Sequence, residues 1–228
     1  MSIEKTFVCL ANSRKYTGRC VAGKEWDGNS FGPWVRPVTM KDKGVLNTER
    51  YCSDWRDPRL LDILEVRLLA PHPYCYQTEN YLVDPSTRWR YVGRLSARQM
   101  LAGVDKVTGP LWINGESTEC GRNDKISGRD ADSLSTSLML VQPQSLQMVV
   151  GTEAAGSSYA RRRIRAHFSL AGHDYALSVT DPALEKQFKL KPDGFATEMS
   201  HPLLCLSLSE KFGSQNACYK LVAAVIPV

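Results

Sequence analysis

Apolar residues in this chain fall in short runs that alternate with polar residues, and helical spacing is scarce. Residues 61–69 show the alternation best, because Leu61 and Ile63 point one way in a strand while Leu64 and Val66 point the other. Further β-prone runs occupy residues 6–10, 34–38, 138–141, 146–150, 161–170, 175–179, 203–208 and 219–225. Short strands at such spacing predict a mostly β protein, a barrel or sandwich rather than a doubly wound α/β fold.

Two short helices interrupt this pattern. Ser96 is placed to cap a helix over residues 97–102 that Gly103 would end. Asp181 is placed to cap residues 182–188, with proline at the first helical position, where a missing N–H costs nothing. Residues 171–174, Ala-Gly-His-Asp, predict a hairpin turn between two strands.

The length of 228 residues allows one large or two small domains. Residues 114–136 are polar and contain glycine, which is typical of a linker or exposed loop. We therefore predict two domains, residues 1–114 and residues 115–228.

Composition indicates an ordinary globular protein, with 43% hydrophobic and 23% charged residues. No apolar run has the length of a membrane span, and residues 1–10 contain Glu4 and Lys5, unlike a signal peptide. The expected compartment is the cytoplasm, with no membrane partner. The seven cysteines show no C-x-x-C spacing, so we expect buried, reduced thiols and no zinc site.

The first half of the chain carries the whole positive excess. Residues 1–114 contain 17 Lys and Arg against 12 Asp and Glu, whereas residues 115–228 contain 12 of each. Such an uneven balance favours a polyanionic partner, although many basic proteins bind no nucleic acid.

Basic and aromatic residues are interleaved between residues 14 and 43. Single-strand binders combine a cationic groove with aromatic platforms, because every base has a face to stack on. The candidate contacts here are Arg14, Lys15, Arg19, Lys24, Trp26, Trp34 and Arg36, with Tyr16, Phe31, Lys41 and Lys43 nearby. The alternative is that these rings belong to the core or its rim and that the charges are ordinary loop charges.

A second basic candidate is the run Arg-Arg-Arg-Ile-Arg-Ala-His-Phe at residues 161–168. Alternation along a strand would place Arg161, Arg163 and Arg165 on one outward face, at a spacing that suits phosphates. The alternative is a solvated face that pairs with acidic neighbours such as Glu153 or Asp174.

The order of several short motifs gives a family resemblance. The chain contains Leu-Ala-Asn-Ser-Arg-Lys at 10–15, Gly-Arg-Cys-Val-Ala-Gly at 18–23, Trp-Val-Arg-Pro-Val at 34–38, Leu-Asp-Ile-Leu-Glu-Val at 61–66, Gln-Thr-Glu-Asn at 77–80, Thr-Asp-Pro at 180–182, Leu-Ser-Leu-Ser-Glu at 206–210 and Tyr-Lys-Leu-Val-Ala-Ala at 219–224. In this order they resemble the prokaryotic dual OB domain family, whose genes often lie near defence or DNA-modification systems. The resemblance implies two tandem OB-fold-like β-barrels of five strands each and a nucleic-acid-binding role. It supplies no catalytic residue.

Catalytic motifs are not apparent: the sequence has no H-E-x-x-H and no P-loop. We therefore expect a protein without enzymatic activity, metal or cofactor. The leading hypothesis is a nucleic-acid-binding module for single-stranded or structured DNA or RNA. The alternatives are a protein-interaction adaptor in a multi-gene defence system, and a sensor for a nucleotide or modified base. Binding of a long strand should weaken steeply with salt, a sensor should saturate with a mononucleotide, and an adaptor should bind neither.

Overall fold

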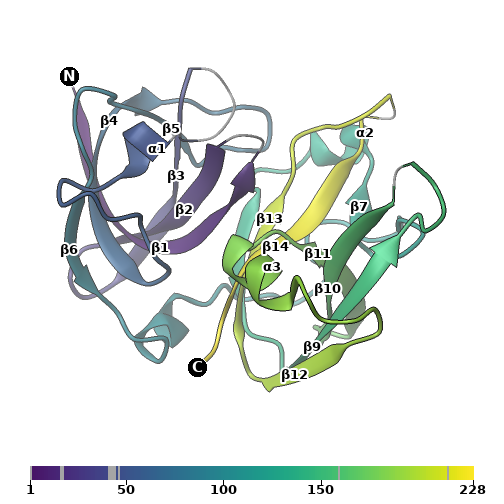
Figure 1. Cartoon of the computed structure of the whole chain (residues 1–228). Coiled ribbons are helices and arrows are strands. Elements are labelled where there is room, and N and C mark those ends of the chain that lie inside the picture. The colour runs from purple at the N-terminus through teal and green to yellow at the C-terminus, as the bar shows by residue number, and fades with distance from the viewer. Residues whose placement is uncertain (1, 16–17, 41–44, 46, 159, 215) are drawn as a thin grey trace. The chain divides into compact units, whose positions relative to one another are not determined.

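The computed structural model describes all residues except 1, 16–17, 41–44, 46, 159 and 215 (Figure 1). The chain divides into two compact units. Unit 1 comprises residues 1–104 and 135–137, and unit 2 comprises residues 105–134 and 138–228. The boundary predicted at residue 114 falls inside unit 2. The mostly β fold class is confirmed, with 51% of residues in strands and 8% in helices.

Unit 1 contains a closed barrel. Its elements in chain order are β1 (Ile3–Lys15), β2 (Gly18–Trp26), β3 (Phe31–Val38), α1 (Asn47–Arg50), β4 (Asp62–Pro71), β5 (Asn80–Val83), β6 (Arg90–Arg94) and the 3-10 helix η1 (Gln99–Gly103). The strand order is β1-β2-β3-β5-β4, and β4 pairs back onto β1. Only β3 and β5 run parallel to each other in this ring. That order, with a helix between the third and fourth strands, is the arrangement of an OB barrel.

Strand β1 is long enough to pair with both β4 and β2. Residues 3–8 pair with β4 and residues 7–15 pair with β2, with a shift of register between Cys9 and Ala11. Gly23 permits the close approach of β2 at this bend, since a Cβ there would lie 1.9 Å from the carbonyl oxygen of Val8.

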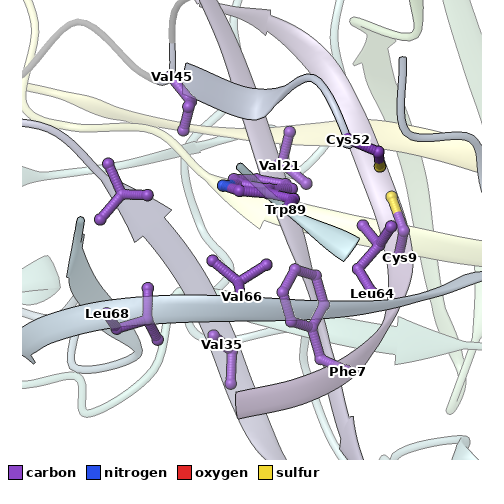
Figure 2. Close-up of a cluster of buried hydrophobic side chains, with 11 residues drawn as sticks. Phe7, Cys9, Val21, Val35, Val45, Cys52, Leu64, Val66, Leu68 and Trp89 are labelled. Atoms are coloured by element: carbon purple, nitrogen blue, oxygen red, sulfur yellow. The ribbon is translucent and has the colours of Figure 1, made fainter. Parts of the chain in front are cut away.

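Alternating residues of these strands fill the barrel. Figure 2 shows the buried Trp89 ring with Phe7, Leu64 and Val66 among the side chains around it. The Phe7 and Trp89 rings meet edge to face, with centroids 6.2 Å apart. Burial of apolar side chains such as these is the main stabilising contribution to a small barrel.

Unit 2 contains the same strand order, with one strand divided in two and with additional strands. Its elements in chain order are β7 (Lys125–Ile126), α2 (Gly128–Ala131), β8 (Leu138–Val141), β9 (Ser145–Glu153), β10 (Arg161–Leu170), β11 (His173–Val179), α3 (Pro182–Phe188), β12 (Ala196–Ser200), β13 (Leu203–Leu208) and β14 (Cys218–Ile226). The sheet order is β12-β9-β10-β11-β14-β13-β8, and β11 and β14 are parallel. Two short consecutive strands, β8 and β9, take the place of β1, because β8 pairs with β13 and β9 pairs with β10. Pro143, between them, has no N–H to offer a ladder.

Most sequence predictions of local structure are confirmed. Helix α3 begins after Asp181, whose side chain accepts a hydrogen bond from the Ala183 N–H. The helix expected at residues 97–102 is instead the 3-10 helix η1, and its N-cap residue is Arg98, not Ser96. The Ser96 hydroxyl nevertheless accepts a hydrogen bond from the Gln99 N–H. Residues 114–136 are not a simple exposed linker, because they contain β7, α2 and the buried Asp124.

Burial of the cysteines varies. Cys9, Cys52, Cys205 and Cys218 are buried, whereas Cys75 and Cys120 are exposed. Among the described residues, no helix combines the length and the apolar character that crossing a bilayer would require.

Candidate nucleic-acid interface

Aromatic side chains gather on the outer surface of β2 and β3 in unit 1. Val21 and Val35 belong to the core, so alternation turns Lys24 and Trp34 outward. Trp26 pairs with Phe31 across the two strands, and their ring centroids are 4.7 Å apart. Lys24 pairs with Trp34, and its Nζ lies 5.5 Å from the centre of that ring.

The 3-10 helix η1 contacts this surface. The Nζ of Lys24 donates a hydrogen bond of 2.8 Å to the carbonyl oxygen of Gly103, and Lys24 is buried. A Cβ at Gly103 would come within 3.0 Å of the Phe31 ring, so the two segments touch. Lys24 therefore holds Trp34 in place, and it is not placed to meet a phosphate in solvent. Trp26, Phe31 and Trp34 stay partly exposed.

The end of the β1–β2 hairpin brings three of the predicted basic residues together. Arg14 is exposed and lies directly across from Arg19, and Lys15 follows it. Like charges directly opposite each other in a ladder are unfavourable. Tyr16, Lys41 and Lys43 lie outside the described residues.

Arg36, also predicted as a contact, is inside unit 1 and only 2% exposed. Its Nη2 lies 2.9 Å from Glu79 Oε1 and donates to Ser137 Oγ at 2.8 Å. Its charge is therefore neutralised within the protein. The sequence could not show this, because Glu79 and Ser137 lie far from residue 36 along the chain.

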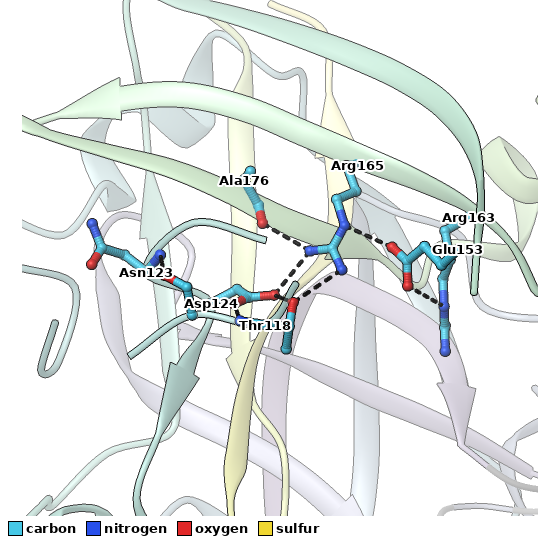
Figure 3. Close-up of polar contacts among 8 residues, drawn as sticks. Thr118, Asn123, Asp124, Glu153, Arg163, Arg165 and Ala176 are labelled. Carbon is cyan, nitrogen blue, oxygen red and sulfur yellow. Dashed lines mark hydrogen bonds and ion pairs between the residues drawn. The ribbon is translucent and has the colours of Figure 1, made fainter. Parts of the chain in front are cut away.

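The arginine run of β10 is mostly engaged with carboxylates (Figure 3). Arg165 is 8% exposed, with Nη1 2.9 Å from Asp124 Oδ2 and Nε 2.7 Å from Glu153 Oε1. Arg163 is partly exposed and lies 3.7 Å from Glu153 Oε2. Only Arg161 of the three expected on the ridge is fully at the surface. The pairing with Glu153, considered as the alternative, is the one that the structure contains.

A second group of aromatic and basic residues in unit 1 includes Trp55, which the sequence analysis did not single out. Trp55 is 68% exposed, and the guanidinium carbon of Arg88 lies 3.8 Å from its ring centre. Next to this pair in the chain, Arg56 lies 4.0 Å from the centre of the Tyr91 ring. Alternation around the buried Trp89 could have turned Arg88 and Arg90 outward, but no sequence signal joins Arg88 to Trp55.

The described residues offer no other obvious chemistry. They contain no group of three or more His, Cys, Asp or Glu side chains that could hold a metal ion. Burial raises the pKa of the Cys52 thiol to about 11, with a smaller contribution from Asp54, so this thiol stays protonated and unreactive at neutral pH.

A closed barrel with the OB strand order, followed by a second sheet with the same order, defines a tandem OB-fold protein. The chain belongs to the dual OB-containing domain family, whose model matches residues 5–225. The resemblance found in the sequence is thereby confirmed over nearly the whole chain. No curated protein and no solved structure matches the chain.

Proposed function

We propose that this protein binds single-stranded nucleic acid on the outer β2–β3 surface of unit 1. The observation that carries the proposal is the group Trp26, Phe31 and Trp34, partly exposed and fixed by cross-strand contacts. OB barrels bind oligonucleotides on the face of this same pair of strands. Rings that are already immobilised lose little freedom when a base stacks on them, which favours binding.

The charge of the two units supports the same surface. Unit 1 contains 16 Lys and Arg against 11 Asp and Glu, whereas unit 2 contains 13 of each. A polyanion is therefore attracted to unit 1, where the aromatic surface lies.

The first test is fluorescence anisotropy of the full chain with labelled single-stranded DNA, single-stranded RNA and duplex, at low and physiological salt. We expect Trp34→Ala to weaken binding of a single strand by about 1–3 kcal/mol, the usual contribution of one stacked base. Trp34→Phe keeps a stacking face and should recover most of the affinity.

Phe212→Ala is the matched control, because Phe212 is an exposed ring of unit 2 (64% exposed) and should not matter. Thermal unfolding of each variant separates loss of contact from loss of fold. Failure of the wild-type protein to bind any strand at low salt would refute the proposal and favour a protein partner. Binding that Trp34→Ala leaves unchanged in a folded protein would remove this surface from the site.

A further inference from the structure

We infer that Trp55 and Arg88 form a second stacking site, which holds an unstacked base of the same strand. The inference rests on the proposed nucleic-acid binding and assigns a contact outside the β2–β3 surface. Trp55 is 68% exposed although a guanidinium lies 3.8 Å from its ring centre, so most of the indole is available to a ligand.

The backbone holds Trp55 in a conformation that favours glycine. Its φ is +64°, in the left-handed region, where a residue with a bulky side chain is a rare outlier. The turn is closed from both sides: the Trp55 N–H donates to the Cys52 carbonyl at 2.8 Å, and the Cys52 N–H donates to the Arg56 carbonyl at 3.0 Å. A tight turn that ends in a left-handed residue usually has glycine there. Tryptophan at this position costs folding energy, and such strain concentrates at binding sites.

Trp55 and Arg88 are both held by backbone contacts to the barrel of unit 1. Cys52 forms a bridge with Trp89, and the Ser53 N–H donates to the Trp89 carbonyl oxygen at 2.8 Å. Trp89 is itself buried in the core of unit 1. The Trp55 turn and Arg88 therefore share one rigid support, which a preformed binding site requires.

Arg88 is available for a phosphate. Over the part of the chain that the structure describes, its guanidinium makes no ion pair. Arg90 and Arg94, on the adjoining strand β6, are by contrast paired with Glu65 and Asp62. A guanidinium stacked on a ring keeps its in-plane N–H groups free to donate to phosphate oxygens.

These features point to a nucleotide rather than to an apolar protein surface. Ser53 and Asp54, which precede Trp55, are exposed and polar, so the ring has no apolar surround of the kind that buries a protein hot spot. One free indole face and one free guanidinium match one base and one phosphate. The occupant is therefore an unpaired nucleotide of a single strand.

The experiment compares full-length wild type, Trp55→Gly and Arg88→Ala in anisotropy titrations with a single-stranded oligonucleotide. The same titrations are repeated with a strand of equal length that carries abasic sites throughout. Glycine suits the left-handed turn, so Trp55→Gly should unfold no more easily than wild type. We expect Trp55→Gly to weaken binding of the normal strand by about 5- to 150-fold and of the abasic strand by less than about twofold. Arg88→Ala should weaken binding of both strands, because phosphates remain in each.

The outcomes separate this inference from the proposed function. Equal affinity of wild type and Trp55→Gly for the normal strand, while Trp34→Ala weakens binding, overturns the Trp55 site and leaves the β2–β3 surface in place. Equal losses with the normal and abasic strands also overturn it, since the ring would then not contact a base. Absence of binding by wild type itself refutes both.

Discussion

At the scale of single residues, the buried Arg165 of this protein pairs with carboxylates from two other segments of the chain. Arg165 on β10 meets Glu153 from β9 and Asp124 from the segment before α2. Asp124 also accepts hydrogen bonds from the N–H and the hydroxyl of Thr118. Figure 3 shows these groups converging on one guanidinium. Arg165 therefore fixes residues 118–124 to the sheet of unit 2.

Replacing Arg165 with methionine should destabilise the protein. The substitution keeps most of the apolar stem but removes the guanidinium that Asp124 and Glu153 share, at a cost of about 3–5 kcal/mol for breaking a buried pair. Arg161→Met on the same strand is the control, because Arg161 is exposed and should change stability by less than about 0.5 kcal/mol. Chemical unfolding measures both. Similar stabilities of the two variants would show that the buried pair contributes little.

Lys220 is another buried charge, only 1% exposed, with Nζ donating to Asn114 Oδ1 at 2.7 Å. Burial lowers its pKa to about 8, against a smaller opposing effect of Asp124. Between pH 8 and the ordinary lysine pKa near 10.5, the unfolded chain binds the proton while the folded protein releases it. The contribution of Lys220 to stability therefore rises with pH across this interval.

Comparison with Lys220→Met isolates that contribution, because all other titrating groups are shared. We expect the free energy of unfolding of wild type, relative to that of the variant, to increase by about 1–3 kcal/mol between pH 7.5 and pH 10. Urea unfolding at several pH values measures the difference. A difference that stays constant over this range would mean that Lys220 keeps its ordinary pKa in the folded protein.

At the scale of elements, two-residue alternation predicts strands well, because each strand has one face turned to a core. Residues 161–170 are strand β10, and residues 182–188 are helix α3, as expected from the pattern and from the Asp-Pro cap. Alternation also turned Ile164, Ala166 and Phe168 inward, and all three are buried. It could not show that Arg165 is buried too, because that depends on Asp124 folding back over the sheet.

The sequence pattern also placed the candidate contacts correctly only where the residues involved are close along the chain. Trp26 and Trp34 lie together on β2–β3 because neighbouring strands are close in sequence, so a local pattern could place them. Arg36 is buried by Glu79 and Ser137, and Trp55 meets Arg88, through contacts between distant parts of the chain. Periodicity in a single sequence contains no information on such pairs.

At the scale of the whole molecule, the two sheets have the same order but different electrostatics. The parallel pairs β3–β5 and β11–β14 identify corresponding strands of the two units. The positive excess lies in unit 1, and the arginines of β10 in unit 2 are largely neutralised by Glu153, Asp124 and Asp193. The contacts predicted from the sequence include eight basic residues, and three of these, Lys24, Arg36 and Arg165, are buried.

We therefore expect a shallow salt dependence for single-stranded DNA. Each neutralised phosphate adds about −0.7 to the slope of log Kobs against log salt, and contact with two to four phosphates gives a slope of about −1.5 to −3. Arg88→Glu should reduce the steepness, whereas Arg161→Glu with Arg163→Glu in unit 2 should leave it unchanged. Titrations from 50 to 300 mM salt measure the slopes. A wild-type slope near −7 would require contact with about ten phosphates and would contradict this expectation. A reduced slope in the unit 2 variant would place those arginines in contact with the strand.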